Sequence, residues 1–325
     1  METIIGKSLI QAAQFLNNNQ LVAMPTETVY GLAGNAFSSI AVQQIYTVKK
    51  RPSYNPLIVH IPNIQYLNTI AKNIPNNAYK LFEAFSPGPL TLLLSKKNIV
   101  PNIVTANLPH VAVRIPNHKL TLQLLNNLSF PLAAPSANLF GYISPTKPEH
   151  VFKQLHNQIP YILNGGACKS GIESTVVGFE KGIPVIYRLG AISKTQIEAI
   201  TGKCLLKNEV NNNAPVSPGM IKYHYSPNTP LLLTNTVDAT IQQLKKKKIG
   251  LISFNKSYET VKVKHKIVLS KKSSLAEAAK NIYAALHSMD ELNVDMIVAE
   301  LLPNKGIGIA VNEKLQKAAA KTTGL

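Results

Sequence analysis

A segment rich in asparagine, proline and glycine separates two parts of this chain. It spans residues 206–229 and includes three consecutive asparagines at 211–213 and the pair Pro218-Gly219. Such a composition is typical of a linker, because these residues disfavour regular helices and strands. The chain has 325 residues, more than one small core needs. We therefore predict a domain of residues 1–205, a linker of residues 206–229 and a smaller domain of residues 230–325.

Hydrophobic periodicity predicts an α/β fold on both sides of the linker. Before it, helices are expected at 8–19, 39–51, 75–85 and 119–127, strands at 21–25, 57–61, 90–95, 111–115 and 131–134, and strands with glycine-rich turns at 161–188. After it, strands at 230–234, 249–254, 266–269 and 294–299 alternate with helices at 237–246, 274–289 and 311–320. This alternation is typical of a small doubly wound α/β domain, whereas the pattern does not give the strand order of the first domain.

The net charge and the cysteines limit the classes of function. A formal charge of +18, spread along the chain, attracts nucleotides, RNA and anionic lipid alike. Two cysteines, Cys168 and Cys204, make neither a disulfide framework nor a metal cluster, which fits a reducing compartment. The sequence has no apolar run long enough for a membrane span or a signal peptide. We expect a cytoplasmic protein without membrane contact.

Polar side chains crowd the end of the first predicted strand, in Pro-Thr-Glu-Thr-Val-Tyr-Gly-Leu at 25–32. Burying three hydroxyls and a carboxylate so close together in a strand is unfavourable unless they have polar partners, so we expect them to face a ligand. A cationic cluster follows, with Lys49 and Arg51, and then Asn55 and His60. His60 by itself also fits an ordinary buried histidine. Hydroxyls beside cations suit a ligand with an amino-acid end and a phosphate end.

Three further segments have the same character. Arg114 stands alone in an apolar strand, where a buried guanidinium must pair with an anion from the protein or from a ligand. Ser136 and Asn138 follow small residues that let a ligand approach the backbone, although a simple turn explains them equally well. Residues 165–177 form a glycine-rich turn before a strand. Its backbone N–H groups could cradle an anion, but it is not a Walker A loop.

Aspartate is absent from the chain before Asp238. The first two-thirds therefore contain neither a pair of aspartates for a Mg²⁺ cage nor a Ser-His-Asp triad. If this region handles a nucleotide, Mg²⁺ must be carried mainly by the phosphates and water, which it tolerates well. We predict no metal ion bound by the protein itself.

In order and wording, these segments resemble the YrdC-like threonylcarbamoyl-AMP synthases, in the long form with a C-terminal domain. The matching stretches are Pro-Thr-Glu-Thr-Val-Tyr-Gly-Leu at 25–32, Lys-x-Arg-Pro at 49–52, Asn-Pro-Leu at 55–57, Ser-Pro-Gly-Pro-Leu-Thr at 86–91, Val-Ala-Val-Arg-Ile-Pro at 111–116, Ala-Pro-Ser-Ala-Asn at 134–138, Ser-Pro-Thr at 144–146 and Gly-Ile-Glu-Ser-Thr-Val at 171–176. Further matches at 217–220, 224–225 and 306–319 extend the resemblance to nearly the whole chain. It implies a YrdC-like twisted mixed sheet with helices, followed by a smaller Rossmann-like α/β domain.

The resemblance implies a nucleotidyltransferase that joins L-threonine, bicarbonate and ATP into threonylcarbamoyl-AMP and releases pyrophosphate. A downstream threonylcarbamoyl-transferase complex would use the product to form N6-threonylcarbamoyladenosine in tRNA. Threonine and bicarbonate give a carbamate, an oxygen nucleophile that is already ionised. The missing triad is therefore no obstacle, and cations that align and neutralise the α-phosphate are expected instead.

Carried over residue by residue, the resemblance implies two sets of binding residues. L-Threonine would be bound by Thr26, His60, Arg114, Ala134 and Ser174. ATP, with its Mg²⁺, would be bound by Lys49, Arg51, Asn55, Thr105, Ser136, Asn138, Ser144, Arg188 and Tyr225. Lys49 and Arg51 are the predicted catalytic residues. Glu27 is expected to brace the site, although a role as a base stays open.

Part of the linker is expected to close over the site. The resemblance implies that residues 217–225 fold back over the mouth of the first domain as a lid, which protects a reactive intermediate from water. In two places the chain departs from the family pattern. Arg188-Leu189-Gly190 stands where Arg-Pro-Gly is common, and the tyrosine before His224 is displaced by one position. Either Tyr223 or Tyr225 is therefore the lid tyrosine.

Two other functions compete with the enzyme. The first is a binding module that grips double-stranded RNA without catalysis, with an affinity that depends steeply on salt. The second is a carbamoyl-transfer domain like that of hydrogenase-maturation proteins, but the chain lacks the cysteines of their zinc-finger modules. The enzyme is the main hypothesis, and weak contact with tRNA is compatible with it.

Overall fold

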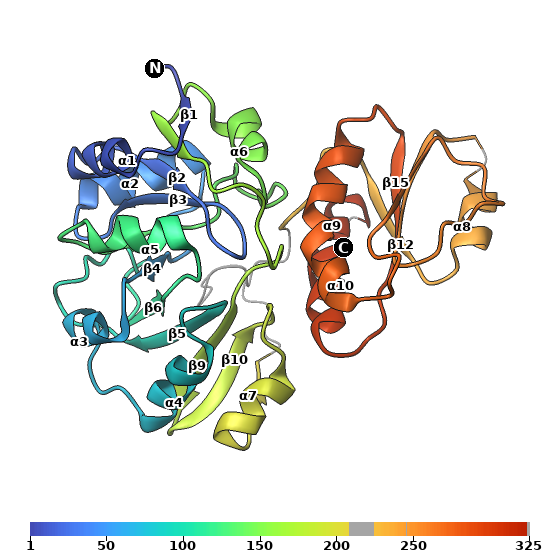
Figure 1. Ribbon diagram of the computed structural model, residues 1–325. Helices are drawn as coiled ribbons and strands as arrows, with labels where there is room; N and C mark the ends of the chain where they lie inside the picture. The colour runs from blue at the N-terminus through green and yellow to red at the C-terminus, as the bar shows by residue number, and fades with distance from the viewer. Residues whose placement is uncertain (208–223, 245, 324–325) are drawn as a thin grey trace.

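The computed structural model describes residues 1–207, 224–244 and 246–323. They form two lobes, each built on its own sheet (Figure 1). The centre of the predicted linker, residues 208–223, lies outside the described residues. The last strand of the first sheet is β11 (Leu205–Leu206), and the first strand of the second sheet is β12 (Leu231–Thr234). The boundaries at 205 and 230 remain a prediction.

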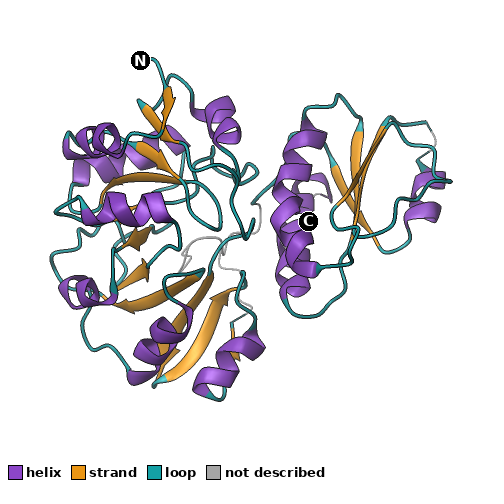
Figure 2. Cartoon of the chain, viewed as in Figure 1, coloured by secondary structure: helices purple, strands orange, loops and turns teal. Residues whose placement is uncertain are grey.

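The first lobe contains an eleven-stranded sheet in the order β1-β8-β2-β3-β7-β4-β6-β5-β9-β10-β11. Parallel and antiparallel pairs are mixed, and helices flank the sheet (Figure 2). Besides β11, its elements are β1 (Ile4–Gly6), α1 (Leu9–Asn17), β2 (Val22–Met24), β3 (Gly31–Asn35), α2 (Ser39–Lys49), β4 (Ile58–His60), the 3-10 helix η1 (Ile64–Tyr66), α3 (Leu67–Ile70), α4 (Asn76–Phe85), β5 (Leu90–Ser95), β6 (His110–Arg114), α5 (Lys119–Asn126), β7 (Leu132–Ala133), α6 (Pro148–Leu155), β8 (Tyr161–Leu163), β9 (Thr175–Glu180), β10 (Ile183–Arg188) and α7 (Lys194–Thr201).

Helices α1 and α2 begin where the sequence places capping side chains. The Ser8 hydroxyl accepts a hydrogen bond from the N–H of Gln11, and the Ser38 hydroxyl accepts one from the N–H of Ala41. The predicted helices and strands of this lobe are present. Other elements of this lobe were not predicted. They are β3, whose two glycines weaken the strand signal, the short strands β1 and β11, and the helices η1, α3, α6 and α7.

The second lobe is a four-stranded parallel sheet in the order β12-β15-β13-β14. Besides β12, its elements are α8 (Val237–Gln243), β13 (Ile249–Ser253), β14 (His265–Val268), α9 (Leu275–Asp290), β15 (Met296–Glu300) and α10 (Ile307–Thr323). Helix α8 covers one face of the sheet, and helices α9 and α10 cover the other (Figure 2). The apolar side chains of α8 and those of α9 and α10 belong to two separate buried clusters. The predicted fold class, a large mixed α/β sheet followed by a small doubly wound domain, is confirmed.

The two lobes share an apolar core. Val29, Ile143 and Ile172 of the first lobe belong to the same buried cluster as Tyr283 of α9 and Leu315 of α10. Helices α9 and α10 therefore face the first lobe with one side and their own sheet with the other (Figure 1). Burial on both sides fixes these helices against loops of the first lobe.

Candidate active site

A narrow cavity of about 50 Å³ lies where strand ends of the first lobe meet residues 224–225. Nine of the residues predicted as ligands line it, namely Thr26, Arg51, His60, Arg114, Ala134, Ser136, Ser174, Arg188 and Tyr225. Five others do not, namely Lys49, Asn55, Thr105, Asn138 and Ser144. The cavity also has walls that the predicted ligand set omits, including Thr28, Glu173 and His224. Segments far apart in sequence thus converge on one cavity.

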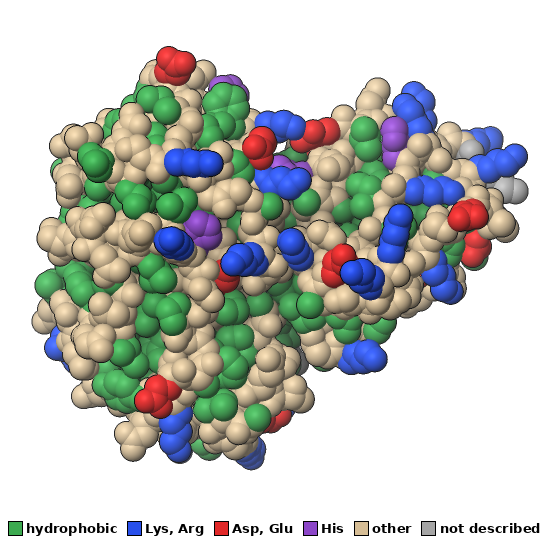
Figure 3. All heavy atoms as spheres, viewed as in Figure 1, with side chains coloured by type: hydrophobic (Ala, Val, Ile, Leu, Met, Phe, Trp, Pro, Cys, Tyr) green, Lys and Arg blue, Asp and Glu red, His purple; other side chains and the backbone are tan. Residues whose placement is uncertain are grey.

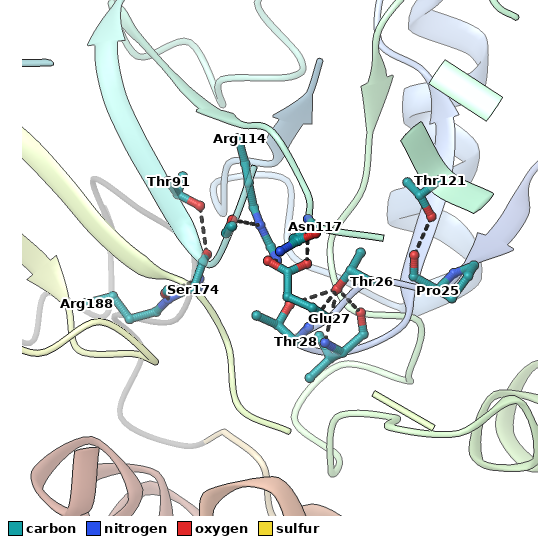
Figure 4. Close-up of polar contacts among 12 residues, drawn as sticks. Pro25, Thr26, Glu27, Thr28, Thr91, Arg114, Asn117, Thr121, Ser174 and Arg188 are labelled. Atoms are coloured by element: carbon teal, nitrogen blue, oxygen red, sulfur yellow. Dashed lines mark hydrogen bonds and ion pairs between the residues drawn. The ribbon is translucent and has the colours of Figure 1, made fainter. Parts of the chain in front are cut away.

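The hydroxyl of Thr26 stabilises the turn after β2. Thr26 Oγ1 accepts hydrogen bonds from the N–H groups of Thr28 and Val29, at 3.1 and 3.2 Å, and donates to the carbonyl of Val29 at 2.6 Å (Figure 4). The sequence predicts that all three hydroxyls of this segment face a ligand. For Tyr30 this is wrong, because its hydroxyl donates to the carbonyl of Gly166 at 2.8 Å and supports the glycine-rich turn.

Arg114 and Glu27 form a buried ion pair. Nη2 of Arg114 lies 2.8 Å from Oε1 of Glu27, and Oε2 of Glu27 accepts from the backbone N–H of Asn117 at 3.0 Å (Figure 4). The anion that a buried guanidinium requires is therefore supplied by the protein, and Glu27 braces the site as predicted. Arg114 remains beside the cavity, where a ligand carboxylate can reach it.

His60 lies next to Arg114 because β4 and β6 pair in parallel with these two residues in register. Burial, together with the Arg114 charge, lowers the pKa of His60 to about 3. Its Nδ1 has no hydrogen-bond partner within the described ranges of the chain. His60 is therefore a neutral imidazole whose side chain lines the cavity.

Lys49 lies behind the cavity wall. It is the last residue of α2, and its Nζ donates to the carbonyl oxygens of Ser136 and Asn138 at 2.6 and 2.5 Å. Burial, and then the nearby Arg51, lower the pKa of Lys49 well below its usual range. Lys49 thereby ties the end of α2 to the segment after β7, and any direct contact with a nucleotide remains a prediction.

Arg51 reaches the cavity from a short loop that its own side chain stabilises. Its guanidinium donates to Asn55 Oδ1 at 2.5 Å and to the carbonyl of Pro56 at 2.9 Å. Its Cζ lies 5.9 Å from the ring centroid of Phe140. Asn55 is fully buried and acts here by holding Arg51 rather than by lining the cavity.

Arg188 and Ser174 meet on the opposite wall. Nη2 of Arg188 donates to the carbonyl and to Oγ of Ser174, both at 2.9 Å, and Ser174 Oγ lies 2.7 Å from the Thr91 hydroxyl (Figure 4). The departure at Leu189 therefore leaves Arg188 in the cavity. Thr105 points elsewhere, because its hydroxyl donates to the carbonyl of Leu108 at 2.9 Å.

His224 and Tyr225 close the cavity from the linker side. Both are buried, and their ring centroids lie 4.1 Å apart. Burial, and then the Arg51 and Lys49 charges, lower the pKa of His224 well below its usual range. Tyr225 stacks on Tyr283 of α9, with ring centroids 5.6 Å apart. Tyr223, the other predicted lid tyrosine, lies outside the described residues.

The comparisons with known proteins cover both lobes. A family model described as telomere recombination, for the Sua5, YciO and YrdC proteins, matches residues 14–190. A second, described as the threonylcarbamoyl-AMP synthase C-terminal domain, matches residues 192–320. The threonylcarbamoyl-AMP synthase of Bacillus subtilis is 41% identical over 320 residues, which is 96% of this chain and 92% of that protein. The enzyme of the same name from Pyrococcus abyssi is 38% identical, over 95% of this chain and 93% of that protein.

This chain belongs to the threonylcarbamoyl-AMP synthase family.

A solved structure agrees with this family assignment. The crystal structure of P. abyssi Sua5 complexed with L-threonine superposes with a TM-score of 0.92 and 36% sequence identity, over 99% of this chain and 98% of that one. The resemblance inferred from the ordered motifs is confirmed, and the family assignment favours the enzyme over the RNA-binding module. The individual ligand roles of the cavity residues remain predictions.

Most of the cavity residues that the predicted ligand set omits could have been found from weak features of the sequence. Glu173 is the single acid in the glycine-rich segment before β9, and His224 adjoins Tyr225, which was predicted. Thr28 belongs to the polar run that was expected to face a ligand. Hydrophobic walls such as Ile58 carry no sequence signal, because an apolar strand residue is equally suited to a core.

Proposed function

We propose that this protein condenses L-threonine, bicarbonate and ATP into threonylcarbamoyl-AMP with release of pyrophosphate. The observation that carries the proposal is the convergence of Arg51, Arg114 and Arg188 with Thr26 and Ser174 on one cavity. Such a site can hold a carboxylate and a polyphosphate side by side. Family membership supports the same conclusion.

The reaction requires the enzyme to align the carbamate with the α-phosphate of ATP more than to activate a nucleophile. The ionised carbamate oxygen of N-carboxythreonine attacks the α-phosphorus of ATP, the new O–P bond forms, and the bond to pyrophosphate breaks. No enzyme nucleophile takes part. The cations of the cavity would neutralise the charge that develops on the phosphate oxygens, and their positions are fixed before the reaction by amide and hydroxyl oxygens.

Within the cavity we assign the two substrates to opposite ends. Arg114, His60, Thr26, Ala134 and Ser174 would contact L-threonine, with the guanidinium of Arg114 shared between Glu27 and the threonine carboxylate. Arg51, Arg188, Ser136 and Tyr225 would contact ATP. Lys49, Asn55, Thr105, Asn138 and Ser144 would shape the nucleotide end from behind the wall or reach it after rearrangement.

Mg²⁺ belongs to the ATP in this proposal. Among the described residues, no group of three or more His, Cys, Asp or Glu side chains is placed to hold a metal ion. The carboxylates at the cavity are already engaged, Glu27 by Arg114 and Glu173 by two hydroxyls. These residues do not fit a metal cage, so Mg²⁺ would arrive on the phosphates with its own water.

His224 and Tyr225 support a lid. With both in place the cavity measures about 50 Å³, whereas ligand pockets typically measure about 300–1,000 Å³. In this arrangement the cavity is too small for ATP, and in this proposal movement of the pair enlarges it. Closure over bound substrates would then keep water away from the reactive carbamoyl-adenylate.

The product is proposed to pass to a threonylcarbamoyl-transferase complex that modifies tRNA, and the net charge of +18 favours weak contact with RNA. None of the helices in the described ranges has the length and apolarity needed to cross a membrane. Location in the cytoplasm remains a prediction from the cysteines and the sequence.

The test is a pyrophosphate-release assay with substrates omitted one at a time. We expect release only when threonine, bicarbonate and ATP are all present, and mass spectrometry should find threonylcarbamoyl-AMP. Equal release without threonine would contradict the proposal. RNA binding without any nucleotide turnover would favour the competing binding module instead.

A further inference from the structure

Glu173 is the only acid among the described residues that line the cavity, and the proposed reaction assigns it no role. It is buried, and it lines the same cavity as Arg188 and Tyr225. A carboxylate at this position cannot contact phosphate, because like charges repel. It can also weaken ATP binding. A Glu173 carboxylate that nothing restrains would turn toward the guanidinium of Arg188 and neutralise the positive charge that binds ATP. The direction in which Glu173 is held therefore matters.

Two hydroxyls hold the Glu173 carboxylate, one from each lobe. Oε1 accepts from Ser144 Oγ at 2.7 Å, and Oε2 accepts from the Tyr283 hydroxyl at 2.8 Å. Ser144 and Glu173 belong to the first lobe, whereas Tyr283 lies on α9 of the second lobe. Hydrogen bonds to an ionised acceptor are stronger than neutral ones, so these contacts select one orientation.

Tyr283 is itself held firmly. It is 1% exposed, and its ring stacks on Tyr225, which lines the cavity. Burial, and then the Glu173 charge, raise the pKa of Tyr283 well above its usual range, so the hydroxyl stays protonated and remains a donor. Lys314 of α10 also reaches the interface, where its Nζ donates to the carbonyl of Leu189 at 2.7 Å. The second lobe thus surrounds this wall of the cavity.

We propose that Tyr283 of the second lobe is a positioning residue for the nucleotide end of the cavity. Its hydroxyl holds Glu173 toward Ser144 and away from Arg188, so that Arg188 keeps its charge for ATP. The role of the C-terminal lobe is then to complete the active site of the first lobe. This inference builds on the proposed function, since it takes ATP as the ligand of Arg188.

The test compares Tyr283→Phe with Tyr258→Phe in the full chain. Tyr258 is a matched control, because its hydroxyl donates to Glu300 at 2.8 Å within the second lobe and neither residue lines the cavity. We expect Tyr283→Phe to weaken ATP binding about tenfold, in line with the loss of a hydrogen bond to a charged group. Threonine affinity should change less than about twofold, and Tyr258→Phe should leave both unchanged.

A double-mutant cycle separates positioning from a merely structural contact. In a Glu173→Gln background the carboxylate charge is gone, so adding Tyr283→Phe should have little further effect on ATP binding. Additive effects would overturn the proposal, as would an unchanged dissociation constant for ATP in Tyr283→Phe. In kinetics, the same variant should raise KM for ATP more than it lowers kcat.

The two proposals can fail separately. Binding of ATP is measured by calorimetry without turnover, so an effect of Tyr283→Phe on ATP affinity supports the positioning role even if no threonylcarbamoyl-AMP forms. Normal product formation with unchanged ATP affinity in Tyr283→Phe overturns the positioning role alone. If the unmodified protein does not bind ATP, both proposals are wrong.

Discussion

At the scale of single residues, the basic side chains around the cavity are held by partners of different charge. Arg114 is paired with the carboxylate of Glu27, whereas Lys49 and Arg51 donate to neutral carbonyl and amide oxygens. Neutral partners hold a cation in place without removing its charge. The positive charge of Arg51 therefore remains available for phosphate at the cavity, while the charge of Arg114 is shared with a protein anion.

Replacing Arg114 tests this difference. The Arg114→Ala variant leaves Glu27 as an uncompensated buried carboxylate, so we expect a loss of about 3–5 kcal/mol in the free energy of unfolding, as for other broken buried pairs. Threonine affinity should fall as well, because the predicted carboxylate contact is lost. Denaturant unfolding and calorimetry with L-threonine measure the two effects.

The double variant Arg114→Ala/Glu27→Gln is the matched control for this prediction. Removing both charges should recover most of the stability but none of the threonine affinity. Equal stability of Arg114→Ala and the unmodified protein would show that the Glu27–Arg114 pair is not a buried ion pair in solution.

At the scale of elements, the functional groups lie at the ends of short strands and helices. His60 and Arg114 end β4 and β6, and Lys49 ends α2, where Lys50 takes the left-handed conformation with φ 52° and stops the helix. Tyr225 has φ 68°, which is unfavourable for a side chain of this size. Contacts with Tyr283 and the cavity wall must hold it there.

Tyr225 is the residue that tests the lid. In Tyr225→Ala the stacking on Tyr283 is lost, which is worth about 0.5–1.5 kcal/mol. We expect the amount of ATP consumed per threonylcarbamoyl-AMP recovered to rise several-fold, because water reaches the adenylate, while ATP affinity falls less. Product yield is measured by chromatography against pyrophosphate release.

A suitable control is Phe152→Ala, which removes an exposed ring on α6. It should leave the ratio of ATP consumed to product unchanged. An unchanged ratio in Tyr225→Ala as well would mean that this tyrosine does not protect the intermediate.

At the scale of the whole molecule, the lobes are joined by polar contacts as well as by the shared core. His150 of α6 stacks on His287 of α9, with ring centroids 3.9 Å apart. The junction is lined by Lys153, Asp290 and Glu291, beside a cavity of about 660 Å³. Figure 3 shows basic, acidic and histidine side chains gathered where the two lobes meet.

The burial of His150 and His287 makes the free energy of unfolding depend on pH. Burial lowers the pKa of His150 to about 3 and that of His287 to about 4, from 6.5. Below pH 6.5 the unfolded chain takes up protons that the folded protein cannot accept until about pH 4, so the free energy of unfolding should fall as the pH drops through this window. Above pH 6.5 both states are neutral and the effect disappears.

Replacing His287 should reduce this pH dependence. Denaturant unfolding of His287→Gln at several pH values should show a shallower slope than the unmodified protein, whereas His265→Gln, at a partly exposed site on β14, should not. Part of the slope should persist, because the pKa values of His60 and His224 are lowered too. An unchanged slope in His287→Gln would contradict this account.

The sequence by itself determined most of the longer elements, the two α/β regions and most of the cavity residues. Hydrophobic periodicity is local, so helices such as α2 and α9 could be predicted from their own residues. The polar residues at strand ends stood out because buried strands exclude them. The ordered motifs then identified the family, since a ligand site needs particular side chains at particular points of the chain.

Only the tertiary structure decided which of these residues meet. It placed Glu27 against Arg114, put Lys49 behind the cavity wall, and brought Tyr283 to Glu173 across 110 residues of chain. No local pattern encodes such contacts, because they depend on the strand order of the eleven-stranded sheet or on how α9 and α10 pack against the first lobe. Sequence fixes what each side chain can do, and packing decides which partner it reaches.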